Sequence, residues 1–169
     1  MYTIRSLSLL ALVGCASPSK QDSARVFTAM TTTTTAAISA AVGDARHHAA
    51  VVPAALAIQF DGACPGGGTM HVDGSYDGPS NGSTAAFDLD MAFAQCKNAL
   101  GDTVDGDVRW TSTASAATGF SETMTGQIAV DGSNFSAACD FDVTLAVTAA
   151  QVSYGGTMCG YDVQVLVTL

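Results

Sequence analysis

The chain has 169 residues, of which 15 are acidic and 6 are basic, so its net charge is −9 at pH 7. A length of this order corresponds to one domain that buries roughly 70% of its unfolded surface and holds a real core. The acidic balance argues against nucleic acid as a partner, because contacts to phosphates need Lys and Arg.

The N-terminus has the pattern of a secretory signal. Met1–Arg5 carries one positive charge, Leu7–Val13 is a short apolar run, and small residues follow at Gly14. The apolar run is too short to span a membrane, so residues 1–14 are expected to be a signal peptide.

The four residues Leu12, Val13, Gly14 and Cys15 resemble the lipobox of bacterial lipoproteins. The resemblance implies cleavage before Cys15, diacylglycerol on its sulfur and acylation of its new amino group. Several acyl chains anchor a protein stably, whereas one chain does not. The alternative is an ordinary secreted protein in which Cys15 is incidental.

The residue after the cysteine indicates which membrane would hold the anchor. Ala16 replaces the Asp that resembles an inner-membrane retention signal in such proteins. The resemblance therefore implies a lipid-anchored protein of the cell envelope, on the outer membrane of a cell that has one. Whether it lies on the periplasmic face or the cell surface stays open.

Four further cysteines are expected to form two disulfides, because an even number in an exported chain is typical of a disulfide framework. They are Cys64, Cys96, Cys139 and Cys159. Free buried thiols or a metal site are the alternatives, and the lack of a CxxC pair argues against metal.

Residues 15–22 would form the lipidated cysteine and a tether, and helical periodicity follows over about residues 23–43. The apolar or small positions are Val26, Phe27, Met30, Ala37, Ile38, Ala41 and Val42. The candidate N-cap residues are Ser19, Asp22 and Ser23, and Gly43 is the candidate end.

The run Thr31–Thr35 opposes this helix, because β-branched side chains lower helix propensity. A disordered Thr-rich stalk is the alternative. Beyond the helix, Asp44–Pro53 is expected to be a connector. We interpret its His47 and His48 as solvated rather than metal ligands, since sequence neighbours rarely share a face.

Alternation of apolar and polar side chains predicts seven strands between about residues 55 and 169. The apolar faces are Leu56, Ile58 and Phe60; Met70, Val72, Gly74 and Tyr76; Phe87, Leu89, Met91 and Phe93; Val104, Gly106, Val108 and Trp110; Met124, Gly126, Ile128 and Val130; Phe141, Val143, Leu145 and Val147; Tyr161, Val163, Val165, Val167 and Leu169. Turn residues separate the strands, and Gln151–Gly156 is expected to be the last such break.

An internal repeat accompanies these strands. Shifting the chain by 54 residues aligns ten identities between Thr69 and Gly106, including Phe87-Asp88 on Phe141-Asp142. We interpret residues of about 69–118 and 119–169 as tandem copies of a three-strand meander. With three strands per copy, the second copy runs opposite to the first.

The fold expected is mainly β. It is a curled antiparallel sheet or partly closed barrel of about seven strands, with one N-terminal helix packed on it, in a single domain over residues 23–169. Glycines on the apolar face, at positions 74, 106 and 126, are expected where the sheet bends or the helix approaches.

This topology tests the disulfide pairing. In a simple meander Cys64 and Cys96 reach the same end of the sheet, so their bond is preferred. Cys139 and Cys159 then fall at opposite ends, which conflicts with a bond that needs Cα atoms within about 7 Å. Either the last hairpin is not simple, or the cysteines pair differently.

No catalytic, cofactor or metal constellation stands out, so no enzyme is expected. The pairs Asp88/Asp90 and Asp105/Asp107 have a spacing compatible with acid–base chemistry, but a solvated strand face accounts for them. No nucleophile motif of the G-x-S-x-G type occurs.

Two functions from different classes remain. The first is a structural or interaction module of the cell envelope, with the membrane contacted through Cys15 and a protein partner of unknown identity. The alternative is a carrier or sensor of a small apolar ligand between sheet and helix. A space filled by Val26, Met30, Ile38 and Trp110 favours the first, and an opening above about 300 Å³ favours the second.

Overall fold

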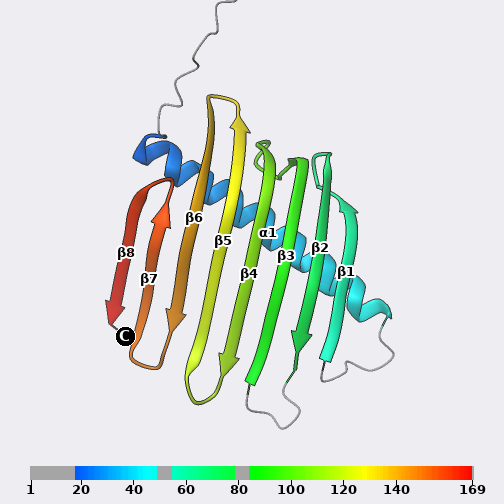
Figure 1. Ribbon diagram of the computed structural model, residues 1–169, viewed down its shortest axis with the longest axis vertical. Coiled ribbons are helices and arrows are strands. Elements are labelled where there is room, and N and C mark those ends of the chain that lie inside the picture. The colour runs from blue at the N-terminus through cyan, green and yellow to red at the C-terminus, as the bar shows by residue number, and fades with distance from the viewer. Residues whose placement is uncertain (1–17, 49–54, 79–83, 169) are drawn as a thin grey trace, which may run out of the picture.

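The computed structural model describes residues 18–48, 55–78 and 84–168 (Figure 1). The expected signal peptide and the lipobox cysteine Cys15 lie outside these residues. The described chain forms one helix and one eight-stranded antiparallel sheet, with the strands in sequence order. The elements are α1 Lys20–His48, β1 Ala55–Ala63, β2 Thr69–Asp77, β3 Thr84–Lys97, β4 Thr103–Ser115, β5 Gly119–Gly132, β6 Phe135–Val147, β7 Gln151–Met158 and β8 Tyr161–Thr168.

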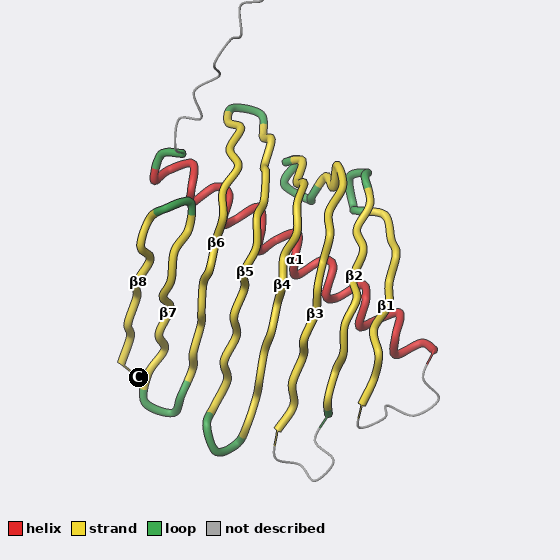
Figure 2. The backbone as a smooth tube through the Cα atoms, in the orientation of Figure 1, coloured by secondary structure: helices red, strands yellow, loops and turns green. Residues whose placement is uncertain are grey.

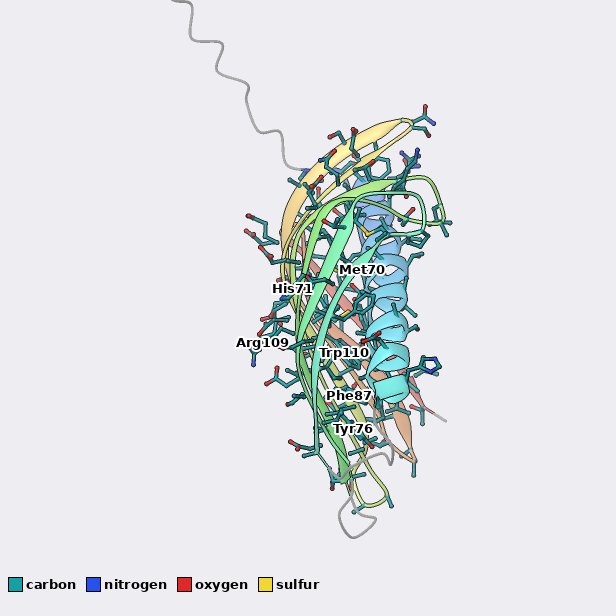
Figure 3. All side chains as sticks on the ribbon, turned by 90° about the vertical axis from the view of Figure 1, so that its right-hand side faces the viewer. Met70, His71, Tyr76, Phe87, Arg109 and Trp110 are labelled. Atoms are coloured by element: carbon teal, nitrogen blue, oxygen red, sulfur yellow. A yellow bond between two sulfur atoms is a disulfide. The ribbon has the colours of Figure 1, made fainter. Side chains whose placement is uncertain are left out.

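The sheet is one layer of the molecule and α1 is the other. The helix crosses the sheet diagonally, beginning at the β7–β8 end and ending beyond β1 (Figures 1 and 2). The sheet curls around the helix (Figure 3), but β1 and β8 do not pair, so it stays open. The expectation of a curled sheet with a packed N-terminal helix is confirmed.

The helix starts at a reciprocal cap. The Asp22 N–H donates to Ser19 Oγ at 3.1 Å, while the Ser19 hydroxyl and N–H donate to Asp22 Oδ2 at 2.6 and 3.2 Å. Ser19 is thus the N-cap among the three candidates. The hydrogen bonds from Ser19 hold the pKa of Asp22 below its ordinary value of 3.8.

The threonine run lies inside the helix, so the stalk alternative is wrong. Thr33 and Thr34 are buried with the apolar stripe that faces the sheet. The Thr31 hydroxyl donates to the Phe27 carbonyl at 2.9 Å, and Thr33 donates to Ala29 at 2.8 Å. Packing of this face outweighs the low propensity of threonine.

The expected end at Gly43 is wrong, because α1 continues to His48 and includes the first part of the expected connector. A helical glycine costs only about 1 kcal/mol relative to Ala. Ala45, beyond the glycine, packs against the core, which favours another turn. No helix in the described part of the chain is long and apolar enough to cross a membrane.

The core lies between α1 and the concave face of the sheet. The predicted apolar strand positions supply most of it, and Val72, Leu89, Val108, Ile128 and Val143 are fully buried. Figure 3 shows Trp110 on the helix side and Arg109 on the convex side, as alternation requires.

The strand β7 was not predicted, because its Gly155-Gly156 pair was interpreted as part of a break. Gly156 has φ +126°, and a Cβ there would lie 2.0 Å from the Asp142 carbonyl oxygen of β6. The glycine thus belongs to a bent strand. The repeat aligns β2 with β5 and β3 with β6, but it sets the turn residue Gly101 against Gly155 inside β7.

The three apolar-face glycines lie where neighbouring strands approach each other closely. Gly74, Gly106 and Gly126 have φ of +152°, +125° and +152°, and a Cβ on each would lie 2.0–2.2 Å from a carbonyl oxygen of the neighbouring strand. The backbone that approaches them is therefore that of the sheet, not that of the helix.

Candidate functional site

The last strand, β8, is an unprotected edge of the sheet. It pairs only with β7, so its other side has no backbone partner in the described chain. Three of its large apolar side chains are exposed: Val165 at 52%, Leu166 at 64% and Val167 at 49%. An exposed apolar edge strand is a template for pairing with another strand.

Both faces of β8 carry apolar side chains, unlike the faces of a typical exposed edge strand. Val163 lies opposite Gly156, which lies opposite the buried Val143, so the valines of β8 continue the concave apolar face. Leu166 is on the convex face, where the other strands carry polar side chains. The only charged residue in β8 is Asp162, so the edge has none of the Lys or Glu that usually block pairing.

The opposite edge, β1, is different. The exposed side chains of β1 are Ala55, Ala57, Gln59, Asp61 and Ala63, and its larger Leu56 and Phe60 pack against the core. The C-terminal half of α1 passes beside it (Figure 1). Among the described residues, exposed large apolar side chains thus concentrate on β8, with Leu100 in a distant turn as the fourth.

An apolar groove of about 460 Å³ adjoins the β8 edge. It lies between the first turns of α1 and the last hairpin. Its lining residues are Lys20, Ser23, Ala24, Phe27, Tyr154, Met158, Tyr161, Asp162, Val163 and Val165. Val165 is common to the groove and the edge, so the two features form one continuous apolar surface.

Tyr161 lines the groove and connects the last hairpin to the segment before α1. Its hydroxyl donates to the Pro18 carbonyl at 3.0 Å, which fixes the segment preceding α1 against the last hairpin. Lys20 Nζ lies 5.8 Å from the centroid of the same ring. These contacts bring the start of the domain to the end of the sheet that carries β8.

Tyr154 lines the groove, but its hydroxyl is not exposed there. The Tyr154 hydroxyl is buried and has no hydrogen bond among the described residues. Burial, and next the negative charge of Glu122, raise the pKa of Tyr154 to about 12. The phenol is therefore neutral near pH 7, and its donor and acceptor are buried without a partner in the described chain.

The space beneath the middle of the helix is filled. Val26 and Met30 are fully buried there, Trp110 is nearly so, and Ile38 packs against the same core. The void lined by Thr33, Met70 and Cys96 measures only about 30 Å³. The side chains expected to fill the space between sheet and helix therefore do so, and the larger groove lies at the β8 end.

Both expected disulfides form. Cys64 is bonded to Cys96, which confirms the preferred pairing, and Cys139 is bonded to Cys159. The conflict over the second bond came from the missing strand. With β7 present, Cys159 reaches the end of the sheet where β6 begins, and its N–H donates to the Asp140 carbonyl at 3.0 Å.

The carboxylate pairs lie on the convex face, and Asp88, Asp90 and Asp105 have cationic or amide partners. Arg109 donates to Asp88 at 2.8 Å and to Asp90 at 3.3 Å. Asp105 accepts from the N–H of Gln95 at 2.7 Å and from its side-chain amide at 2.8 Å, at the point where the β3–β4 register shifts. Asp107 is exposed. These contacts match a solvated strand face.

The histidines do not converge. His47 is exposed at the end of α1, and the side chain of His48 lies outside the described set. His71 Nδ1 lies 2.7 Å from Asp61 on the convex face. Within the described ranges, no three His, Cys, Asp or Glu side chains gather as a metal site would require.

The sequence interpretation overlooked Tyr154 and Glu122, which lie in or beside segments assigned to breaks. A signal existed: Glu122 is the single glutamate of the chain, two residues before Met124 and thus on the same strand face.

Comparison with known proteins found no matching family model, curated protein or solved structure.

Proposed function

We propose that this protein is an exported, lipid-anchored module of the cell envelope that acts by binding another protein strand along β8. The role is structural rather than enzymatic. The chain is held at the outer membrane through Cys15, and the sheet is the part that is presented to a partner.

The observation that supports this proposal is the exposure of Val165, Leu166 and Val167 on a strand that has only β7 as a neighbour in the described sheet. Pairing of an extended segment with an open edge uses backbone hydrogen bonds for affinity and the alternate side chains for specificity. The two disulfides favour an oxidising compartment, as in the cell envelope.

The anchor is tested by changing Cys15→Ser in the full chain. Loss of the acylation site should move the protein from the membrane fraction to the soluble fraction, because stable anchoring needs its acyl chains. Mass spectrometry of the wild-type N-terminus measures the added lipid directly. A Cys15→Ser protein that stays with the membranes would contradict the anchor.

The β8 surface is tested by crosslinking in intact cells that make the full chain. Leu166→Lys introduces a charge on the convex side of the edge and should abolish crosslinked adducts. Leu100→Lys is the matched control, because Leu100 is 59% exposed in a turn remote from β8. Equal adducts from both variants would rule out β8 as the binding surface.

A second candidate function is a carrier or sensor of a small apolar ligand, which the groove of about 460 Å³ favours. The probe is N-phenyl-1-naphthylamine, a neutral dye that fluoresces in apolar sites. Ala24→Trp should narrow the groove and reduce saturable dye binding, while Ala55→Trp at the far edge should not. Absence of saturable binding by the wild type would exclude the carrier.

A further inference from the structure

We infer that the strand partner of β8 is β8 of a second copy, paired antiparallel across a two-fold axis at Val165. This inference rests on the proposed function, since it names the partner for the same edge. The product is one sheet that continues through both copies.

The length and the side chains of β8 together select the register. In an antiparallel pair related by a two-fold axis, the residue at the axis lies opposite itself. The eight residues of β8 allow two centres that leave a single residue unpaired: Gln164 pairs residues 161–167, and Val165 pairs residues 162–168. Val165 is the better centre, because a centre at Gln164 would set Asp162 opposite the apolar Leu166. Val163 then lies opposite Val167 of the second copy, and Gln164 lies opposite Leu166.

The charges on β8 are compatible with self-pairing even though the chain carries a net charge of −9. Directly opposed like charges destabilise a strand pair. In this register Asp162 lies opposite Thr168 of the second copy, so the only charged residue of the strand does not meet itself. All three concave-face valines meet valines.

Pairing of β8 with β1 of the second copy fits less well. That contact would be head-to-tail, which builds a ring or an open filament rather than a closed two-fold dimer. It would also set the exposed Val165, Leu166 and Val167 against an edge whose exposed side chains are alanines, Gln59 and Asp61. The apolar surface is matched best by its own copy.

The contact is small, because one strand pair lies at the low end of specific interfaces, below about 1,200 Å². A shared membrane compensates for this, since anchoring both copies raises their effective concentration. Val165 also lines the groove, so the second strand would extend the apolar floor beside Phe27 and Tyr154.

The first experiment is oxidative crosslinking of the full chain in membranes. Val165→Cys places two thiols opposite each other at the axis, and the other thiols of the domain are held in disulfides. We expect roughly tenfold more covalent dimer than from Leu100→Cys, an exposed control on a turn. Gln164→Cys and Leu166→Cys should crosslink poorly alone and well when the two are coexpressed.

The second experiment uses charge at the axis. Val165→Lys alone and Val165→Asp alone should each lose self-association, measured by co-isolation of two differently tagged copies. Coexpression of the Lys and Asp variants should restore it, because opposite charges then face each other across the axis. Misfolding of either variant would not produce this rescue.

The outcomes separate the two proposals. Suppose that Val165→Cys gives no more dimer than Leu100→Cys, while Leu166→Lys still removes adducts to another protein. Self-pairing of β8 is then wrong, but the proposed function, binding of a protein partner along β8, is still supported. If neither self-association nor any adduct depends on β8, both proposals are overturned.

Discussion

Phe27 of α1 and Tyr154 of β7 meet edge to face, with ring centroids 5.6 Å apart and planes at 69°. This contact joins the first turns of the helix to the last hairpin, which are far apart in sequence. It also forms one wall of the apolar groove. The packing of these two rings therefore controls how closely α1 holds β7 and β8.

We predict that Phe27 and Tyr154 are energetically coupled. In a double-mutant cycle with Phe27→Leu and Tyr154→Leu, the coupling free energy should be about 0.5–1.5 kcal/mol, as for other aromatic pairs. Urea unfolding of the four proteins measures it. A cycle of Phe27→Leu with Tyr76→Leu, whose ring packs at a tilt against Phe87 instead, is the control and should be additive.

Two tyrosines of the same region should respond oppositely to loss of their hydroxyls. Tyr154→Phe should raise the free energy of unfolding by about 1 kcal/mol, because a buried hydroxyl without a partner is removed. Tyr161→Phe should lower it by about 1 kcal/mol, because the bond to the Pro18 carbonyl is lost. If both changes shifted the free energy of unfolding equally in urea, the hydroxyls of Tyr154 and Tyr161 would not differ in hydrogen bonding as described.

The stability should also depend on alkaline pH through Tyr154. Its pKa is about 12 in the folded protein against an ordinary value of 10.0. A raised folded pKa contributes stability that is fully present below pH 10 and is lost as the pH rises towards 12. The wild type should therefore lose more stability than Tyr154→Phe over this interval, measured by unfolding at pH 9 and pH 11.

The two disulfides should protect different parts of the sheet. Replacing Cys139 and Cys159 by Ser should cost about 3 kcal/mol, since the bond closes a loop across a sequence separation of 20. Amide exchange should then increase most in β7 and β8. Replacing Cys64 and Cys96 should instead increase exchange in β1 and β2, and a uniform increase in both variants would refute this division.

Two glycines should respond oppositely to Ala. Gly126→Ala should lower the free energy of unfolding by more than about 1 kcal/mol, because its Cβ would lie 2.1 Å from the Asp107 carbonyl oxygen at φ +152°. Gly43→Ala should raise it by about 1 kcal/mol, because this helical position has no heavy atom within 4 Å of the new Cβ. Thermal unfolding of both variants checks the signs.

The faces of the strands were predictable because alternation is a local property. Phe87 and Leu89, or Phe141 and Val143, must point to one side of any strand that contains them. The bond between Cys64 and Cys96 was predictable for the same reason, since it depends only on a simple meander. The helix was also predictable, although Thr31–Thr35 opposes it locally.

The strand β7 was missed because Gly155-Gly156 has the local chemistry of a turn. Only the neighbouring β6 backbone, close to Gly156, shows that a side chain would be excluded there. That one strand reverses the direction of everything after it. The bond between Cys139 and Cys159 and the position of β8 at the edge both follow from its presence.

The amino-acid sequence by itself determined which side chains are apolar and at what spacing, and hence the helix, most strands and their buried faces. Only the tertiary structure decided that the described sheet stays open, that β8 pairs on one side alone within it, and that Tyr154 meets Phe27 beside a groove. These features depend on contacts between residues distant in the chain, and the energies of such contacts are not encoded in any local pattern.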